Sequence, residues 1–289
     1  MFGYTKQYML IIDFFFNDEG ALKMNGIAIV VASFDGYKDI WPVFISAKER
    51  FWPDCPYKTY LVSNFETVCS DAVTPIHTGA ETNWCNRMEK ALNEIPEDTI
   101  VLLLEDYLMG EKVQTGLVEQ YLRKFQNERM EYLRIIDIPK ANGKQNQVTA
   151  IDEDVEYGVN LQPSIWNKEY LIELLSSIGG TRSAWDFEVT LLKDAHKGRS
   201  IPKKGCYAFK GNLLNIHNGV LKGKWFPNEV RYFKKQGIAV DTSVRPLLSF
   251  KESTEYRIRM ILRNVIPKGM RRDLKKILKK FGMKFASDV

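Results

Sequence analysis

The stretch Thr99-Ile100-Val101-Leu102-Leu103-Leu104-Glu105-Asp106 decides the fold, because a charge-free run of six residues ends there in two adjacent acids. A short, continuous apolar run is typical of a strand that is buried on both faces, as in parallel sheets covered by helices. The residues Pro96-Glu97-Asp98 supply the turn before it. The stretch therefore predicts a central strand over 99–104 that places Glu105 and Asp106 at its carboxyl end.

Strand and helix patterns alternate around this segment from Gly26 to Asp137, and the elements they predict are strands over 27–32, 59–62, 72–76 and 132–136, and helices over 40–51, 84–95 and 113–125. This alternation is typical of an α/β protein with a mixed, mostly parallel sheet flanked by helices, in which ligands bind at the carboxyl ends of the strands. Asp39 is expected to cap the first helix. Residues 137–160 are polar and predict a long loop or an irregular hairpin. Further helices are expected over 168–176 and from about Trp185.

The composition is that of a globular protein, with 289 residues of which 45% are hydrophobic and 27% are charged. Transmembrane proteins are excluded at this stage, because no apolar stretch approaches the roughly 20 residues that a spanning helix needs. The segment Tyr8–Phe16 contains Asp13 and makes a poor secretory signal, so the cytoplasm is the expected location. The four cysteines form no CxxC pair and are expected to be reduced and buried, and the presence of only three histidines argues against a dedicated His-rich metal site.

Charge is concentrated at the C-terminal end of the sequence. Residues 257–285 contain eleven Lys or Arg and a single Asp, whereas the whole chain has a net charge of only +5, so the remainder is mildly acidic. Apolar residues recur there at helical spacing, at Met270, Leu274, Ile277, Leu278, Phe281 and Phe285. Such a helix is typical of one lying in the headgroup layer of an anionic membrane.

Two other interpretations of the basic segment are a helix packed on the body with a solvated basic face, and a nucleic-acid contact. The membrane is favoured because the apolar stripe is wide, and because the rest of the chain has no basic clusters interleaved with aromatic residues. No nucleic-acid partner is expected. The predicted organisation is an N-terminal extension over 1–25, an α/β domain over 26–255 and a membrane-associating tail over 256–289, on the inner face of the membrane.

Glu105 and Asp106 are the first candidates for a binding site. A carboxylate at the carboxyl end of a buried strand can hold a divalent cation against a diphosphate. Because successive strand residues point to opposite faces, one of the two acids is expected to face the site. The alternative is a strand that simply ends in two solvated acids.

A series of short motifs runs from Gly26 to about Phe250. They are Ile29-Val30-Val31-Ala32-Ser33-Phe34-Asp35 followed by Trp41, Trp52-Pro53-Asp54-Cys55-Pro56, Leu61-Val62-Ser63-Asn64, Trp84 with Arg87, Leu102-Leu103-Leu104-Glu105-Asp106, Leu161-Gln162-Pro163-Ser164-Ile165-Trp166-Asn167-Lys168, Trp185-Asp186-Phe187-Glu188 and Gly223-Lys224-Trp225. In their order and spacing they resemble the bacterial GT-A-fold glycosyltransferases, particularly the sugar transferases of capsular polysaccharide and lipopolysaccharide synthesis.

The resemblance implies a nucleotide bound between the ends of the first two strands. Ser33, Asp35 and Asn64 would then contact the base and ribose, and Arg87 would face the diphosphate. A guanidinium suits that role, because it is always charged and binds phosphate oxygens in a bidentate way. The alternative for Arg87 is an exposed helical residue paired with Glu94 or Glu81.

The Asp-x-Asp metal motif of the family is altered in this sequence. Asp106 keeps one acid as a candidate ligand for Mn²⁺ or Mg²⁺, while Tyr107 stands where a further Asp would be. If no cation binds, the resemblance leaves Arg87, Lys224 and the basic residues near 203–204 to stabilise the departing diphosphate.

The segment Trp185-Asp186-Phe187-Glu188 is similar to the one in which inverting enzymes of the family hold their catalytic base. Asp186 and Glu188 are about 200° apart on a helix and do not share the role. For each, the alternative is structural: an acid favoured by the helix dipole at Asp186, and a solvated acid at Glu188. His217 is expected to be structural, with metal ligation as the other interpretation.

The sequence thus predicts a glycosyltransferase that moves a sugar from a nucleotide-sugar donor to a glycan or lipid-linked glycan. One alternative is a non-catalytic binding module that acts through the basic tail on a membrane or nucleic acid. Another is a nucleotidyltransferase, although no Gly-rich phosphate loop with a following Lys comes after the first strand.

Overall fold

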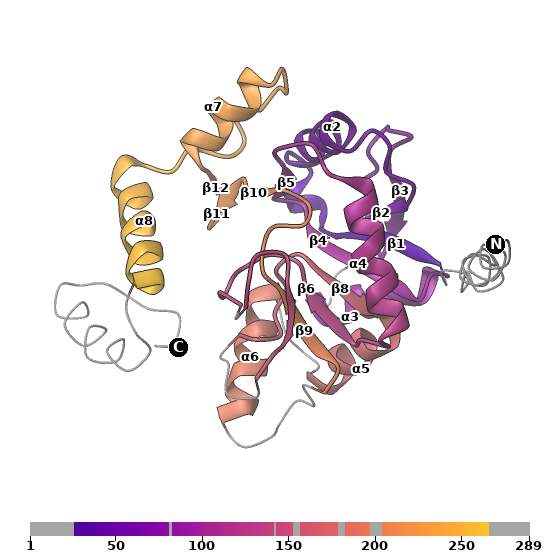
Figure 1. Cartoon of the computed structure of the whole chain (residues 1–289). Coiled ribbons are helices and arrows are strands. Elements are labelled where there is room, and N and C mark those ends of the chain that lie inside the picture. Colours follow the sequence, from indigo (N-terminus) through magenta and orange to yellow (C-terminus); the bar gives the residue numbers. More distant parts are fainter. Residues whose placement is uncertain are drawn as a thin grey trace, which may run out of the picture.

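The computed structural model describes residues 26–80, 83–141, 143–152, 157–178, 183–196 and 204–265. Its centre is a sheet of eight strands in the order β3-β2-β1-β4-β8-β6-β9-β7 (Figure 1). The strands are β1 (Ile27–Ala32), β2 (Lys58–Ser63), β3 (Thr74–His77), β4 (Thr99–Leu104), β6 (Tyr132–Arg134), β7 (Val148–Ala150), β8 (Ser164–Asn167) and β9 (Cys206–Phe209).

The sheet is mostly parallel, as the sequence predicts. β3, β2, β1 and β4 run in one direction, β8 is antiparallel to β4 and β6, and β7 is antiparallel to β9. β1 and β4 are paired along their whole length, with Ala32 opposite Leu104. This register places the chain after β1 beside the chain after β4, at one edge of the sheet.

Helices cover both faces of the sheet (Figure 1). α2 (Trp41–Phe51) and α4 (Thr115–Asn127) contribute to the hydrophobic cluster on one face, and α3 (Trp84–Glu94), α5 (Lys168–Ile178) and α6 (Ala184–His196) contribute to the cluster on the other. Strand residues alternate between the two clusters: Ile29 and Val31 belong to the first, and Ala28 and Val30 to the second. This double burial explains why the central strands are apolar throughout.

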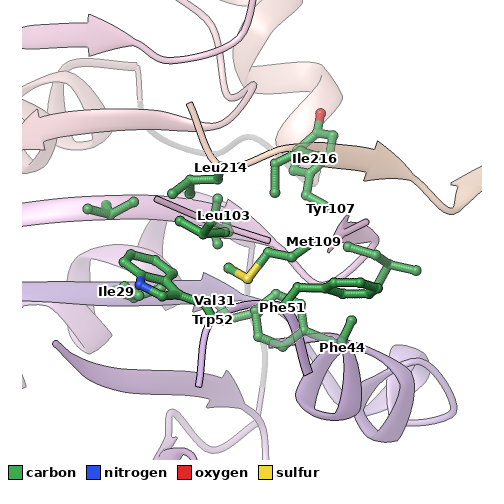
Figure 2. Packing of buried hydrophobic residues seen from close by; sticks show 14 of the residues in the cluster. Ile29, Val31, Phe44, Phe51, Trp52, Leu103, Tyr107, Met109, Leu214 and Ile216 are labelled. Carbon is green, nitrogen blue, oxygen red and sulfur yellow. The ribbon is translucent and has the colours of Figure 1, made fainter. Parts of the chain in front are cut away.

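Figure 2 shows the packing of the first cluster, where Phe44, Phe51 and Trp52 from the α2 region meet strand residues that include Val31 and Leu103. Trp52 and Phe44 are about 1% exposed. Met109 and Tyr107 join them from β5 (Tyr107–Met109), a short strand that directly follows the Glu105–Asp106 turn. Burial of these large side chains contributes roughly 1.5–3 kcal/mol each to folding, so this core fixes the position of the turn.

The sequence predicts no helix or strand between β9 and the basic tail, and this segment forms several. β10 (Ile216–Asn218) pairs with β5 in antiparallel register, and β11 (Val220–Leu221) pairs with β12 (Lys224–Trp225). α7 (Pro227–Lys235) and α8 (Phe250–Val265) follow. Trp225 and Phe233 are fully buried in the first cluster, so this C-terminal segment is part of the same core.

Three other expectations differ from the structure. Residues 137–160 contain β7, which pairs with β9 and not within the segment itself. α2 is preceded by Ile40, with no side-chain capping bond, because Asp39 pairs with Arg245 instead. Cys85 and Cys206 are buried as expected, but Cys69 is exposed; none of the four is in a disulfide.

The predicted domain limits fall partly outside the described residues. Residues 1–25 and 266–289 are not described, and these contain the predicted extension and most of the basic tail. α8 begins at Phe250 and continues through the predicted limit between 255 and 256. Within the described ranges no helix combines the length and the apolar character needed to cross a membrane.

Candidate active site at the ends of β1 and β4

Ser33 and Glu105 meet at the carboxyl edge of the sheet, directly after the paired ends of β1 and β4. The Ser33 hydroxyl accepts a hydrogen bond of 2.8 Å from Nε1 of Trp41, and its interaction with the Glu105 carboxyl opposes the rise in the pKa of that acid. Ser33 and Glu105 are 2% and 7% exposed. Trp41 in the first turn of α2 thus orients the serine toward the acid, which joins the strand end to the helix that follows it.

Glu105 and Asp106 influence each other electrostatically. The strand ends at Leu104, and the two acids form a turn in which side chains no longer alternate between faces. Burial raises the pKa of both carboxyls, and the charge of Asp106 raises the pKa of Glu105 further. The alternative of two solvated acids is therefore wrong for this strand end.

Asp106 has an unusual hydrogen-bonding state. Its backbone carbonyl accepts a hydrogen bond of 2.9 Å from the amide of Gly219, next to the end of β10. Among the described residues, its buried Oδ1 has no hydrogen-bond partner, and the same holds for Oδ1 of Asn218. Buried acceptors without a partner cost roughly 1–3 kcal/mol each, so the protein retains two oxygens that suit a ligand hydroxyl, a water molecule or a hard cation.

Arg87 supplies positive charge to this edge. It is 6% exposed, its guanidinium carbon lies 5.3 Å from the ring centroid of Phe34, and its charge lowers the pKa of Glu105. The expected alternative of an exposed arginine is thus wrong, and Glu81, one of the two partners expected for it, lies outside the described residues. Asn83 accepts a hydrogen bond of 2.9 Å from the amide of Asn86 and caps α3, which holds Arg87 in the first turn of the helix beside the strand ends.

A second arginine, Arg245, was missed by the sequence analysis. It is 8% exposed and lies in the loop before α8, where no periodic pattern distinguishes it. Its charge lowers the pKa of Asp106, although burial is the larger effect and keeps that pKa above its ordinary value. Tyr37 is a neighbour of the two acids. Burial and the charges of Glu105 and Asp106 raise the pKa of its hydroxyl.

Asp35 and Asn64 brace the ends of β1 and β2 against each other. The Asp35 carboxylate accepts hydrogen bonds from the amides of Asn64, Phe65 and Glu66, with 2.9 Å to Asn64. In return, Oδ1 of Asn64 accepts from the Asp35 amide at 3.2 Å, and its amide group donates to the Gly79 carbonyl. Both side chains thus shape the two loops that the resemblance assigns to the nucleotide.

The structure separates the two candidate bases. Glu188 accepts a hydrogen bond of 2.8 Å from the amide of Leu161, and its charge raises the pKa of Tyr107, as do Glu105 and Asp106. Asp186 lies in the first turn of α6, where its amide donates to the hydroxyl of Ser183. Glu188 thus lies close enough to Tyr107 to act on its pKa, whereas Asp186 makes its described contact with Ser183 at the start of the helix.

Lys224 and His217 have nearby partners of their own. Lys224 forms an ion pair of 2.7 Å with Glu252 of α8, and this contact together with hydrogen bonds to Ser249 lowers the pKa of Glu252 to about 2. Nδ1 of His217 lies 2.7 Å from Glu229, whose hydrogen bond raises the pKa of the imidazole, and the ring packs on Tyr232. In the described part of the chain, no group of three or more His, Cys, Asp or Glu could hold a metal ion.

Comparisons with known proteins give structural likeness only. No family model and no curated protein matches the sequence. Among solved structures, residues 1–349 of S. aureus TarS match 64% of this chain with 10% identity and a TM-score of 0.40, and the match covers 58% of that chain, less than two thirds of its length. A CMP:2-keto-3-deoxy-manno-octonic acid synthetase complexed with CTP matches 73% of this chain and 99% of that one, with 12% identity and a TM-score of 0.44.

A third structure, the 2-C-methyl-D-erythritol 4-phosphate cytidylyltransferase from Thermus thermophilus, matches 57% of this chain and 84% of its own, with 10% identity and a TM-score of 0.36. These likenesses assign no substrate or reaction to this chain. Any function therefore has to be argued from the residues of the site.

Proposed function

We propose that this protein is a glycosyltransferase that moves a sugar from a nucleotide-sugar donor to a glycan or lipid-linked glycan in the synthesis of a surface polysaccharide, such as capsule or lipopolysaccharide. The main support is the meeting of Ser33, Arg87 and the Glu105–Asp106 pair at the carboxyl edge of a mostly parallel sheet. Ligands of open α/β sheets bind at that edge. The motif order that resembles the GT-A-fold enzymes adds the class of substrate.

In this proposal, Arg87 offsets the charge of the donor diphosphate. The loops that Asp35 and Asn64 brace, together with Ser33, receive the base and ribose. Oδ1 of Asp106 accepts a hydrogen bond from a sugar hydroxyl or binds Mn²⁺ or Mg²⁺, since a carboxylate oxygen without a partner is a suitable ligand for a hard cation. A cation held there would neutralise charge on the diphosphate as it leaves.

Glu188 is the better placed of the two candidate bases. Its charge raises the pKa of Tyr107, as do the charges of Glu105 and Asp106, and this supports a position of Glu188 near the acid pair. A carboxylate there would accept the proton of an acceptor hydroxyl as its oxygen attacks the anomeric carbon. Asp186 remains a second candidate, and separate replacement of each acid by Ala distinguishes them.

A nucleotide screen tests the proposal. We expect thermal stabilisation by UDP, GDP or CMP, with and without Mn²⁺, and we expect Asp106→Ala to reduce donor turnover by orders of magnitude. Near-normal turnover of that variant would remove Asp106 from the site. A wild-type protein that responds to no nucleotide would contradict the proposed function as a whole.

Nucleotidyl transfer is the second candidate. The buried acid pair beside an arginine suits nucleotidyl transfer from a nucleoside triphosphate as well as glycosyl transfer from a nucleotide sugar. The products distinguish them. Release of pyrophosphate from a nucleoside triphosphate would support nucleotidyl transfer, whereas release of a nucleoside mono- or diphosphate from a nucleotide sugar would support the proposed glycosyl transfer.

We also propose that the protein binds the inner face of a membrane through residues 257–285 and the exposed apolar residues just before them. Val244, Leu247 and Phe250 are 69%, 45% and 89% exposed, and Ile258 on α8 is 44% exposed. Basic residues follow along the sequence, and each Lys or Arg near an anionic surface contributes about 1 kcal/mol. This location would bring the site close to a lipid-linked acceptor.

A further inference from the structure

Arg245 joins two parts of the chain that lie 206 residues apart in sequence. Its Nε and Nη2 donate to the two carboxylate oxygens of Asp39, at 3.1 and 3.0 Å, in a bidentate pair. The two side chains are only 10% and 8% exposed. Breaking a buried pair of this kind by removing one partner is strongly destabilising, because it leaves a buried charge without compensation.

The guanidinium of Arg245 also donates hydrogen bonds to two backbone carbonyls. Nη1 donates to the carbonyl of Gly223 at 3.1 Å, in the turn between β11 and β12, and Nη2 donates to the carbonyl of Gly36 at 3.4 Å. Arginine has five N–H donors, so four hydrogen bonds leave little capacity for a phosphate. Arg245 is thus suited to hold other groups in place, and not to bind a ligand itself.

The main group that Arg245 holds in the site is Tyr37. The guanidinium carbon lies 4.2 Å from the centroid of the Tyr37 ring, and Tyr37 in turn packs on Phe34 with 5.0 Å between ring centroids. Phe34 lies under Arg87. The result is a row of two packed rings, Phe34 and Tyr37, with a cation at each end, Arg87 on Phe34 and Arg245 on Tyr37. Both ends of the row act on the Glu105–Asp106 pair.

We propose that Arg245 is a positioning residue of the candidate site: it fastens the segment 34–39 to the β11–β12 turn and holds the Tyr37 ring beside the Glu105–Asp106 pair, so that the site is preset for a nucleoside diphosphate. The ligand class rests on the proposed function. The fastening of segment 34–39 does not, because it follows from the bonds of Arg245 alone.

The first experiment needs no ligand. Hydrogen exchange is measured on wild-type protein, Arg245→Lys and Asp39→Asn, with Arg231→Lys as control, because Arg231 is an exposed arginine that hydrogen-bonds to Asn228 on its own helix. We expect amide exchange in residues 34–39 to be at least tenfold faster in the first two variants than in wild-type protein. The ratio of the exchange rates of β1 and β4 should stay the same. Lysine keeps the charge but cannot form the bidentate pair with Asp39. Arg245→Lys therefore still tests the proposal if Asp39→Asn does not fold.

The second experiment uses the nucleoside diphosphate that binds best in the screen. We expect Arg245→Lys to raise its Kd about tenfold, and to have no further effect in a Tyr37→Ala background, because a residue that acts through another gives non-additive losses. Additive losses would overturn the action through Tyr37. Unchanged exchange in residues 34–39 would overturn the proposal itself, even if the protein binds nucleotides. If wild-type protein binds no nucleotide, the proposed function fails and the exchange result still decides the role of Arg245.

Discussion

At the scale of single residues, the site is defined by charges that the fold buries side by side. Glu105 and Asp106 are adjacent in sequence, share a turn and are both withdrawn from water, which favours their neutral forms. Arg87 and Arg245 oppose this effect without removing it. Burying these charges lowers the stability of the protein, and clusters of groups with shifted pKa values are typical of functional sites.

This pair makes stability depend on pH. A carboxyl whose folded pKa is raised stabilises the protein fully below its ordinary pKa, and this stabilisation is lost as the pH rises through the folded value. From pH 5 to 8, we expect wild-type protein to lose stability relative to Glu105→Gln/Asp106→Asn, by at most about 1.4 kcal/mol per pH unit and group. Urea denaturation across this range measures it. Parallel pH profiles of the two proteins would show that the acids are not perturbed.

The sequence identified Glu105, Asp106, Ser33 and Arg87 as candidates, and the structure brings these four together. It did not identify Arg245 or Tyr37. Arg245 lies in a loop with no periodic pattern, and its importance comes from Asp39, far away in sequence. The assignment of Asp39 as a helix cap was wrong for the same reason, since a buried arginine competes with a local cap only after the chain has folded.

At the scale of elements, α3 positions Arg87, and its start depends on the Asn83 cap. We expect Asn83→Ala to lower the free energy of unfolding by about 1 kcal/mol, because one amide of the first turn loses its acceptor. Gln114→Ala is the matched control. Gln114 precedes α4 in the same way but makes no side-chain capping bond, so its replacement should change little. Equal losses in the two variants, measured by chemical denaturation, would contradict the role of the cap.

The β5–β10 pair depends on a close approach at Gly110. A Cβ on Gly110 would lie 2.3 Å from the ring of His217, and that ring is held by Glu229 and Tyr232. We expect Gly110→Ala to destabilise the protein by about 1–3 kcal/mol. Gly116→Ala, in the first turn of α4 with no atom within 4 Å of its Cβ, should be neutral or slightly stabilising. Thermal unfolding compares them, and a Gly110→Ala protein as stable as wild type would refute the clash.

At the scale of the whole molecule, four of the large apolar side chains that are exposed in the described residues lie between 244 and 258. We expect the double variant Leu247→Ser/Phe250→Ser to sediment several-fold less with vesicles that contain anionic lipid, and to keep its nucleotide response. Phe65→Ser is the control, because Phe65 is 66% exposed but follows β2. Unchanged sedimentation of the double variant would show that this surface does not contact the membrane.

The sequence by itself determined the central strands, the flanking helices and the carboxyl edge at which the acids lie. These follow from local apolar periodicity, which reports directly how a segment is buried. Only the tertiary structure decided that Glu105 and Asp106 influence each other, that Arg87 is buried, and that Arg245 from the C-terminal segment acts on Asp106. Those outcomes depend on contacts between residues up to 209 positions apart, and no local pattern encodes which distant charge a buried carboxylate will meet.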